Sequence, residues 1–270
     1  MLAAFIEGVG VWGPGLPGWE KAAEVLRGDS PYNPGPAPLP VLEILAPAER
    51  RRVAPATKLA LSVGWAALAD ARADGADIRS VFASSGGDGE TINAILATLA
   101  TANREVSPTR FHNSVHNAPS GYWSLATRSH APSTTVSAHD YSFAAGLIEA
   151  MTQISVDEDP VLLIAYDQPY PEPLHRERPL IAGFGVALLM SHAPSPRASA
   201  RITLSLEDGT AAGTTLRDRE LEALRLGNPA ARALPLLRLL ACGRDAAVIL
   251  DGAGADRLVV SCYARPPGAW

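Results

Sequence analysis

Residues 133–150 read STTVSAHDYSFAAGLIEA, and their pattern predicts a strand followed directly by a helix. The first part, residues 134–137, is β-branched or small, which suits a buried strand. From Ser142 onward the apolar spacing is that of a helix packed on a core. His139 and Asp140 are therefore expected at a strand-to-helix corner, a place where α/β enzymes expose a nucleophile beside a helix N-terminus. The predicted tip residue, Asp140, is neither a thiol nor a good acyl acceptor.

Strands and helices alternate through the rest of the chain, which predicts an α/β layered fold. Strands are expected at residues 3–11, 80–85, 160–166, 181–190 and 201–206, with a closing hairpin formed by 246–250 and 257–263. Helices are expected at residues 19–27, 48–73 and 92–102, with one or two more between 216 and 240.

The composition is that of an ordinary globular protein of 270 residues, with 47% hydrophobic and 19% charged residues. A net charge of -5 gives no electrostatic reason to expect nucleic acid or an anionic membrane as partner. The first 15 residues lack a basic segment, and Glu7 interrupts their apolar run, so neither a signal peptide nor a membrane helix is predicted. Cys242 and Cys262 are expected to be free thiols in a reducing cytoplasm.

Residues 106–123, VSPTRFHNSVHNAPSGYW, are interpreted as a loop unusually rich in aromatic and polar side chains. His112 and His116 have the spacing of two metal ligands on a helix, but prolines bracket the segment and no third ligand is evident, so no metal is expected. Ser120 lacks the flanking glycines of a nucleophile elbow. The glycine-rich turn at residues 86–89 has no following lysine, so neither a phosphate nor a cofactor is expected there.

Several of these landmarks, taken in order, resemble the β-ketoacyl synthase family of the thiolase fold. They are the opening GVGVWGPG, the VFASSGG strand and turn, the corner itself, PVLLIAYD, GFGVALLM and the late CGRDAAVIL segment. The resemblance implies a thiolase-like layered fold (α/β/α/β/α) with a truncated C-terminal half. It divides the chain into a ketosynthase N-terminal-like lobe, residues 1–195, and a reduced C-terminal lobe, residues 196–270, packed into the same domain.

The same resemblance places Asp140 over the acyl-accepting cysteine of the family, with Ser137, Ala138 and His139 over the three residues before it. A carboxylate there would form an unstable mixed anhydride, so the usual condensation should fail. The family's two C-terminal histidines also have no counterpart, because no histidine follows His192. No catalytic residue is therefore assigned.

This combination resembles the shortened chain-length-factor subunits of aryl polyene biosynthesis. It implies a heterodimer with an active ketosynthase, contact with an acyl carrier protein, and an acyl tunnel near the corner. The tunnel or dimer-interface candidates are Phe111, His112, His116, Tyr122, Trp123, Ser137, His139, Asp140, Tyr141 and Phe143.

Other interpretations of these residues stay open. The aromatic candidates are equally suited to ordinary core or interface packing. Asp140 is expected to pair with His139, with His116 or with an arginine of the partner subunit, because an unpaired buried carboxylate is costly. Alternatively, the chain is a decarboxylase or hydrolase of acyl thioesters that uses Asp140 with one of these histidines, or a self-associating scaffold that forms a homodimer.

Overall fold

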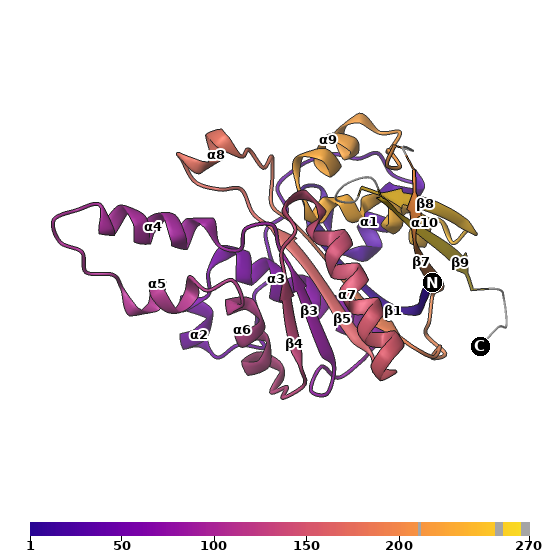
Figure 1. The fold of residues 1–270 in the computed structure, drawn as a ribbon, viewed down its shortest axis with the longest axis horizontal. Coiled ribbons are helices and arrows are strands. Elements are labelled where there is room, and N and C mark those ends of the chain that lie inside the picture. Colours follow the sequence, from indigo (N-terminus) through magenta and orange to yellow (C-terminus); the bar gives the residue numbers. More distant parts are fainter. Residues whose placement is uncertain (210–211, 252–255, 266–270) are drawn as a thin grey trace.

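A mixed β-sheet runs through the centre of the protein (Figure 1). The computed structural model describes residues 1–209, 212–251 and 256–265. Its strands are β1 (Leu2–Gly13), β2 (Leu16–Pro17), β3 (Arg79–Ala83), β4 (Ser133–Val136), β5 (Val161–Asp167), β6 (Phe184–Ser191), β7 (Ala200–Asp208), β8 (Ala246–Leu250) and β9 (Asp256–Ala264). Their order is β4-β3-β5-β6-β1-β7-β9-β8, with β2 paired to β1. β3 is parallel to β4 and β5, whereas the other pairs are antiparallel.

Helices pack on both faces of the sheet. They are α1 (Trp19–Arg27), α2 (Pro47–Arg52), α3 (Pro55–Ala71), α4 (Gly89–Leu99), α5 (Pro108–Asn113), α6 (Ala118–Thr127), α7 (Ser142–Asp157), α8 (Leu174–Glu177), α9 (Arg219–Gly227) and α10 (Leu234–Cys242), with 3-10 turns η1 (His139–Tyr141) and η2 (Ala230–Ala233). α7 contributes to one hydrophobic core, whereas α3 and α6 contribute to the other. The predicted α/β layering is thus confirmed.

The central strand β5 explains why there are two cores. Alternate side chains of a strand point to opposite faces of the sheet. Val161 and Leu163 accordingly pack in the core with α7, whereas Leu162 and Ile164 pack in the core with α3. All seven residues of this strand are buried, as its continuous apolar sequence predicted.

The prediction of a single helix over residues 48–73 is wrong. The chain instead forms two helices, α2 and α3, which are separated by Val53 and Ala54. Pro55 disfavours the helical conformation of the residue before it and then begins α3 at a position where its missing N–H costs nothing. The arginines at 50–52 consequently lie in the last turn of α2, where the helix dipole favours cations.

The loop predicted over residues 106–123 is also wrong, because this segment forms α5 and most of α6. Pro108 and Pro119 bracket it, but each lies in the first turn of its helix, where proline is well tolerated. Prolines that were interpreted as helix breakers therefore mark helix starts.

α4 and α5 extend away from the sheet together (Figure 1). We call residues 89–115 the arm. α4 has no buried residue. Five large apolar side chains of the arm are at least 39% exposed, namely Ile92, Leu96, Leu99, Phe111 and Val115.

The C-terminal strands continue the same sheet, since β7 pairs with β1, and β9 pairs with both β7 and β8. The predicted closing hairpin is confirmed, although part of its turn lies outside the described residues. The division of the chain at residue 195 stays a prediction. Among the described residues, no helix is both long enough and apolar enough to cross a membrane.

Candidate functional site

The strand-to-helix corner lies where β4 ends and α7 begins, as the sequence predicted. The 3-10 turn η1 connects the two elements. The Ser142 hydroxyl accepts a hydrogen bond from the Ala138 backbone N–H (3.0 Å) and donates one to the His139 carbonyl (2.7 Å), which closes the turn. His139 has a left-handed backbone, with φ of 53°. The strained residue of the corner is therefore His139, one position before Asp140.

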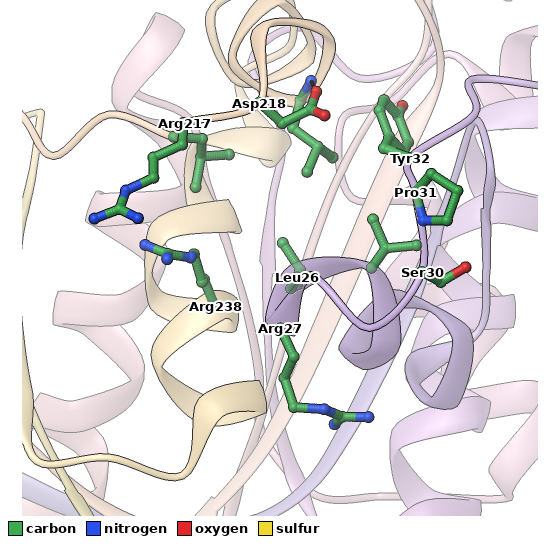
Figure 2. Close-up of a pocket in the computed structure, with 12 residues that line it drawn as sticks. Leu26, Arg27, Ser30, Pro31, Tyr32, Arg217, Asp218 and Arg238 are labelled. Atoms are coloured by element: carbon green, nitrogen blue, oxygen red, sulfur yellow. Dashed lines mark hydrogen bonds between the residues drawn. The ribbon is translucent and has the colours of Figure 1, made fainter.

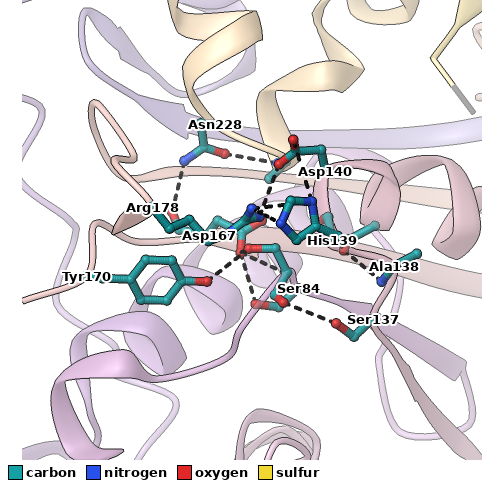
Figure 3. Close-up of polar contacts among 12 residues, drawn as sticks. Ser84, Ser137, Ala138, His139, Asp140, Asp167, Tyr170, Arg178 and Asn228 are labelled. Atoms are coloured by element: carbon teal, nitrogen blue, oxygen red, sulfur yellow. Dashed lines mark hydrogen bonds and ion pairs between the residues drawn. The ribbon is translucent and has the colours of Figure 1, made fainter. Parts of the chain in front are cut away.

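Arg178, from the loop after α8, covers this corner (Figure 3). Its Nη2 lies 3.0 Å from Asp140 Oδ1 in an ion pair, and its Nη1 contacts both ring nitrogens of His139. His139 Nδ1 is also 3.6 Å from Asp140 Oδ2. The predicted pairing of Asp140 with His139 is thus present. The arginine that pairs with Asp140 is Arg178 of the same chain, rather than an arginine of a partner subunit.

The protonation of His139 beside Arg178 and Asp140 is decided by the Arg178 guanidinium group, which can donate hydrogen bonds but cannot accept them. His139 Nε2, the ring nitrogen closer to Arg178 Nη1, must therefore act as the acceptor, and this hydrogen bond occupies the lone pair that a general base would use. The Asp140 carboxylate has its charge balanced by Arg178.

A buried carboxylate, Asp167 at the end of β5, lies beside the corner (Figure 3). Its Oδ1 accepts hydrogen bonds from the Ser84 hydroxyl (3.1 Å), the Ser85 hydroxyl (2.7 Å) and the Ser85 backbone N–H (2.8 Å). Its Oδ2 has no hydrogen-bond partner within the described part of the chain. Burial raises the pKa of Asp167 to about 6, against the opposing effect of these hydrogen bonds and of the Arg178 charge.

Further hydrogen bonds connect Asp167 to the corner. The Ser137 hydroxyl donates to the Ser85 carbonyl (3.1 Å), which ties the end of β4 to the end of β3. Asn228 donates to the Asp167 carbonyl (3.2 Å) and to the Ala182 carbonyl (2.8 Å). Asp167 therefore lies at the centre of a network that holds several chain segments around the corner.

The aromatic candidates do not gather at one place. Tyr122 and Trp123 are buried in the core with α3, whereas Phe143 is buried in the core on the other face of the sheet. Phe111 is 69% exposed on the arm. Tyr141 is half-buried within η1, at the corner itself.

The two histidines of the arm region have different surroundings. His112 lines a pocket of about 470 Å³ with Phe111, and its ring meets the Tyr122 ring edge to face, with centroids 6.0 Å apart. His116 lies beside Gly87, and its Nε2 is buried without a hydrogen-bond partner in the described residues. Within residues 1–209, 212–251 and 256–265, no group of three potential metal ligands occurs.

Both thiols lie in C-terminal elements, away from the corner. Cys242 ends α10, and Cys262 is buried in β9. Burial raises the pKa of Cys262 to about 11, so its reactive thiolate form is scarce at neutral pH.

The sequence interpretation missed Arg178 and the residues that bind Asp167. Asp167 directly follows the strand predicted over residues 160–166, but no local pattern links it to Ser84, Ser85 or Asn228. Arg178 lies in the segment LHRERP after a proline-rich loop, and only a charge count of that segment could have singled it out.

The fold and this corner define a thiolase-like α/β protein. A family model described as the N-terminal domain of β-ketoacyl synthase matches residues 19–234. Since this match spans well over half of the sequence, the chain belongs to the β-ketoacyl synthase family. A search of curated proteins gives no match.

Solved structures with the same fold include ketosynthase complexes. The chain is similar to one in the complex of a ketosynthase (ApeO) with its chain length factor (ApeC) from Xenorhabdus doucetiae, with 23% identity, a TM-score of 0.73, and coverage of 97% of this chain and 100% of that one. For the ishigamide ketosynthase/chain length factor the identity is 16%, the TM-score 0.74, and the coverage 98% and 100%. A β-ketoacyl synthase from Burkholderia phymatum STM815 has 16% identity, a TM-score of 0.60, and coverage of 91% and 71%. At these identities the likeness concerns the fold.

Proposed function

We propose that this protein is a ketosynthase-like subunit of the chain-length-factor type, without condensing activity of its own. It pairs with an active β-ketoacyl synthase, receives an acyl carrier protein at the assembled dimer, and helps to shape the path of the growing acyl chain. The resemblance to aryl polyene systems makes such a pathway the proposed setting.

The observation that carries this proposal is the chemistry of the corner. Condensation by this family needs a thiolate at the N-terminus of the helix. Here His139 and Asp140 occupy the corner, and Arg178 engages both side chains. The left-handed backbone at His139 makes a second alignment reasonable, in which His139 replaces Asp140 at the cysteine position. Either alignment leaves a residue that cannot form a stable thioester.

Two surface features support pairing with another subunit. β4 is the last strand at one end of the sheet and is only partly buried, so its outer edge is a template for further strand pairing. The arm presents several exposed apolar side chains, and such patches mark interaction surfaces.

The experiment is co-purification followed by a condensation assay. The tagged chain is isolated from its own cells, its native mass is measured, and malonyl-carrier condensation is assayed with and without the co-purified protein. We expect a cysteine-bearing ketosynthase to co-purify and condensation to require both chains.

A different result would overturn the proposal. If the isolated chain turns over an acyl thioester and Asp140→Ala abolishes that turnover, the protein is a decarboxylase or hydrolase. If the chain forms a stable homodimer that binds none of the ketosynthases tested, it is a self-associating scaffold.

A further inference from the structure

A second pocket lies away from the corner, between the end of α1 and the start of α9 (Figure 2). Its volume is about 530 Å³, within the range of small-molecule sites. Its floor is apolar and made of buried side chains, namely Val25, Leu26, Leu216 and Leu221. None of its lining residues belongs to the corner or to the network around Asp167.

Two of the charged residues around this pocket already have partners. Arg27 Nε lies 2.6 Å from Asp29 Oδ2. Asp218 caps α9, because its Oδ1 accepts the backbone N–H groups of Glu220 (2.9 Å) and Leu221 (3.0 Å). The charge of this carboxylate is thus stabilised by the helix N-terminus.

Tyr32 forms a neutral part of the wall. Its hydroxyl donates a hydrogen bond to the Pro14 carbonyl (3.0 Å). Burial, together with the nearby charges of Glu220 and Asp218, raises its pKa to about 12. The tyrosine therefore adds no negative charge to the pocket at neutral pH.

Arg217 and Arg238 have no such partners. Neither side chain makes an ion pair or a hydrogen bond within the part of the chain that the structure describes, although both line this pocket. Figure 2 shows their guanidinium groups on the same side of it. Two uncompensated like charges at one pocket repel each other, and an anion between them would remove that repulsion.

We propose that this pocket binds a small phosphate monoester that carries an apolar group. A phosphate monoester has a charge of about -1.5 to -2 at neutral pH, which matches two arginines, and guanidinium groups bind phosphate oxygens through paired hydrogen bonds. The apolar group would lie on the floor formed by Leu26 and Leu221. A carboxylate carries only one charge and would be bound more weakly.

Calorimetric titration with phenyl phosphate at fixed ionic strength and neutral pH tests this proposal. Arg217→Gln and Arg238→Gln should each raise the Kd about tenfold, which corresponds to about 1.4 kcal/mol, because each removes charge-assisted hydrogen bonds to the phosphate. The matched control is Arg27→Gln, which removes an arginine of the same pocket that is already paired, and its Kd should change by less than about threefold. Arg217 is exposed, so its variant should fold normally, which circular dichroism verifies.

Further probes separate the parts of the ligand. Inorganic phosphate tests the anion alone, benzoate tests a single negative charge, and benzyl alcohol tests the apolar group alone. All three should bind more weakly than phenyl phosphate. The proposal is overturned if phenyl phosphate does not bind, if the Arg217 and Arg238 variants bind it as tightly as the Arg27 variant does, or if inorganic phosphate or benzoate binds as tightly as phenyl phosphate.

Discussion

At the scale of single residues, the corner depends on side chains that are far apart in the sequence. Arg178 holds His139 and Asp140, and Asp167 binds the residues that follow β3. The predicted corner residues are at the predicted place, but their chemistry is decided by these partners. Arg178 could not be predicted because its loop has no periodic pattern that would fix its position.

Asp167 should make stability depend on pH. Its pKa rises from 3.8 to about 6 on folding, so the folded state binds the proton more tightly than the unfolded state. The resulting stabilisation is complete below pH 3.8 and is lost as the pH rises through about 6. A shift of about two pKa units corresponds to about 3 kcal/mol.

Asp167→Asn removes this titration while keeping a hydrogen-bond acceptor. The free energy of unfolding of this variant, relative to wild type, should therefore increase by about 3 kcal/mol between acid and neutral pH in urea titrations. Glu177→Gln removes an exposed negative charge and controls for net charge. If the free energy of unfolding changed with pH in the same way for wild type and for Asp167→Asn, the prediction would be contradicted.

A cysteine introduced at the corner should be reactive. The His139 side chain is 67% exposed, and it lies beside Arg178 near the start of α7, where a positive environment lowers a thiol pKa. We expect His139→Cys to react with iodoacetamide about tenfold faster than the native Cys262, as measured by intact mass.

Asp140→Cys decides between the two alignments of the corner. The Asp140 side chain is 39% exposed, so a cysteine there should react more slowly than one at position 139. Adding Arg178→Gln to His139→Cys should slow its alkylation. Faster alkylation at position 140 would support the original placement of the family's cysteine at Asp140.

At the scale of elements, the periodic segments were predicted well and the proline-rich ones were not. α7 has the apolar spacing of a helix, and β5 is a continuous apolar run of the length typical of a buried strand, so the positions of both follow from local sequence. α5 and α6 were missed because their prolines mark helix starts as well as breaks. Proline restricts the backbone in both cases, and only the neighbouring packing decides between them.

The aromatic candidates should separate by their effect on stability. Phe143 lies in the first turn of α7, and its side chain is 1% exposed in the hydrophobic core. Phe143→Ala should therefore lower the free energy of unfolding by about 3–5 kcal/mol. Phe111→Ala, at 69% exposure, should change it by no more than about 0.5 kcal/mol. Urea denaturation measures both. If Phe143→Ala left stability unchanged but lengthened the products of the assembled pair, Phe143 would line the acyl tunnel rather than the core.

At the scale of the whole molecule, the arm and the free edge of β4 leave apolar and backbone surface available for a partner. Leu96→Asp should therefore weaken pairing with the ketosynthase about tenfold or more, because it places a charge on the exposed apolar face of α4. Analytical ultracentrifugation of the two purified chains measures the Kd.

Val156→Asp is the matched control for this experiment. Val156 is also an exposed apolar residue, 75% exposed against 59% for Leu96, but it lies near the end of α7 rather than on the arm. Its variant should pair as tightly as wild type. Equal weakening by both substitutions would mean that the arm has no special part in assembly.

The α/β alternation, the strand-to-helix corner at His139 and Asp140, and the resemblance to ketosynthases could all be predicted from the sequence, because each depends on motifs made of residues close together in the chain. Only the tertiary structure decided that Arg178 engages Asp140, that Asp167 is buried among serines, and that Arg217 and Arg238 share a pocket. These arrangements bring together residues from separate elements. The order of the strands and the packing of helices on the sheet fix such distances, and no local pattern encodes them.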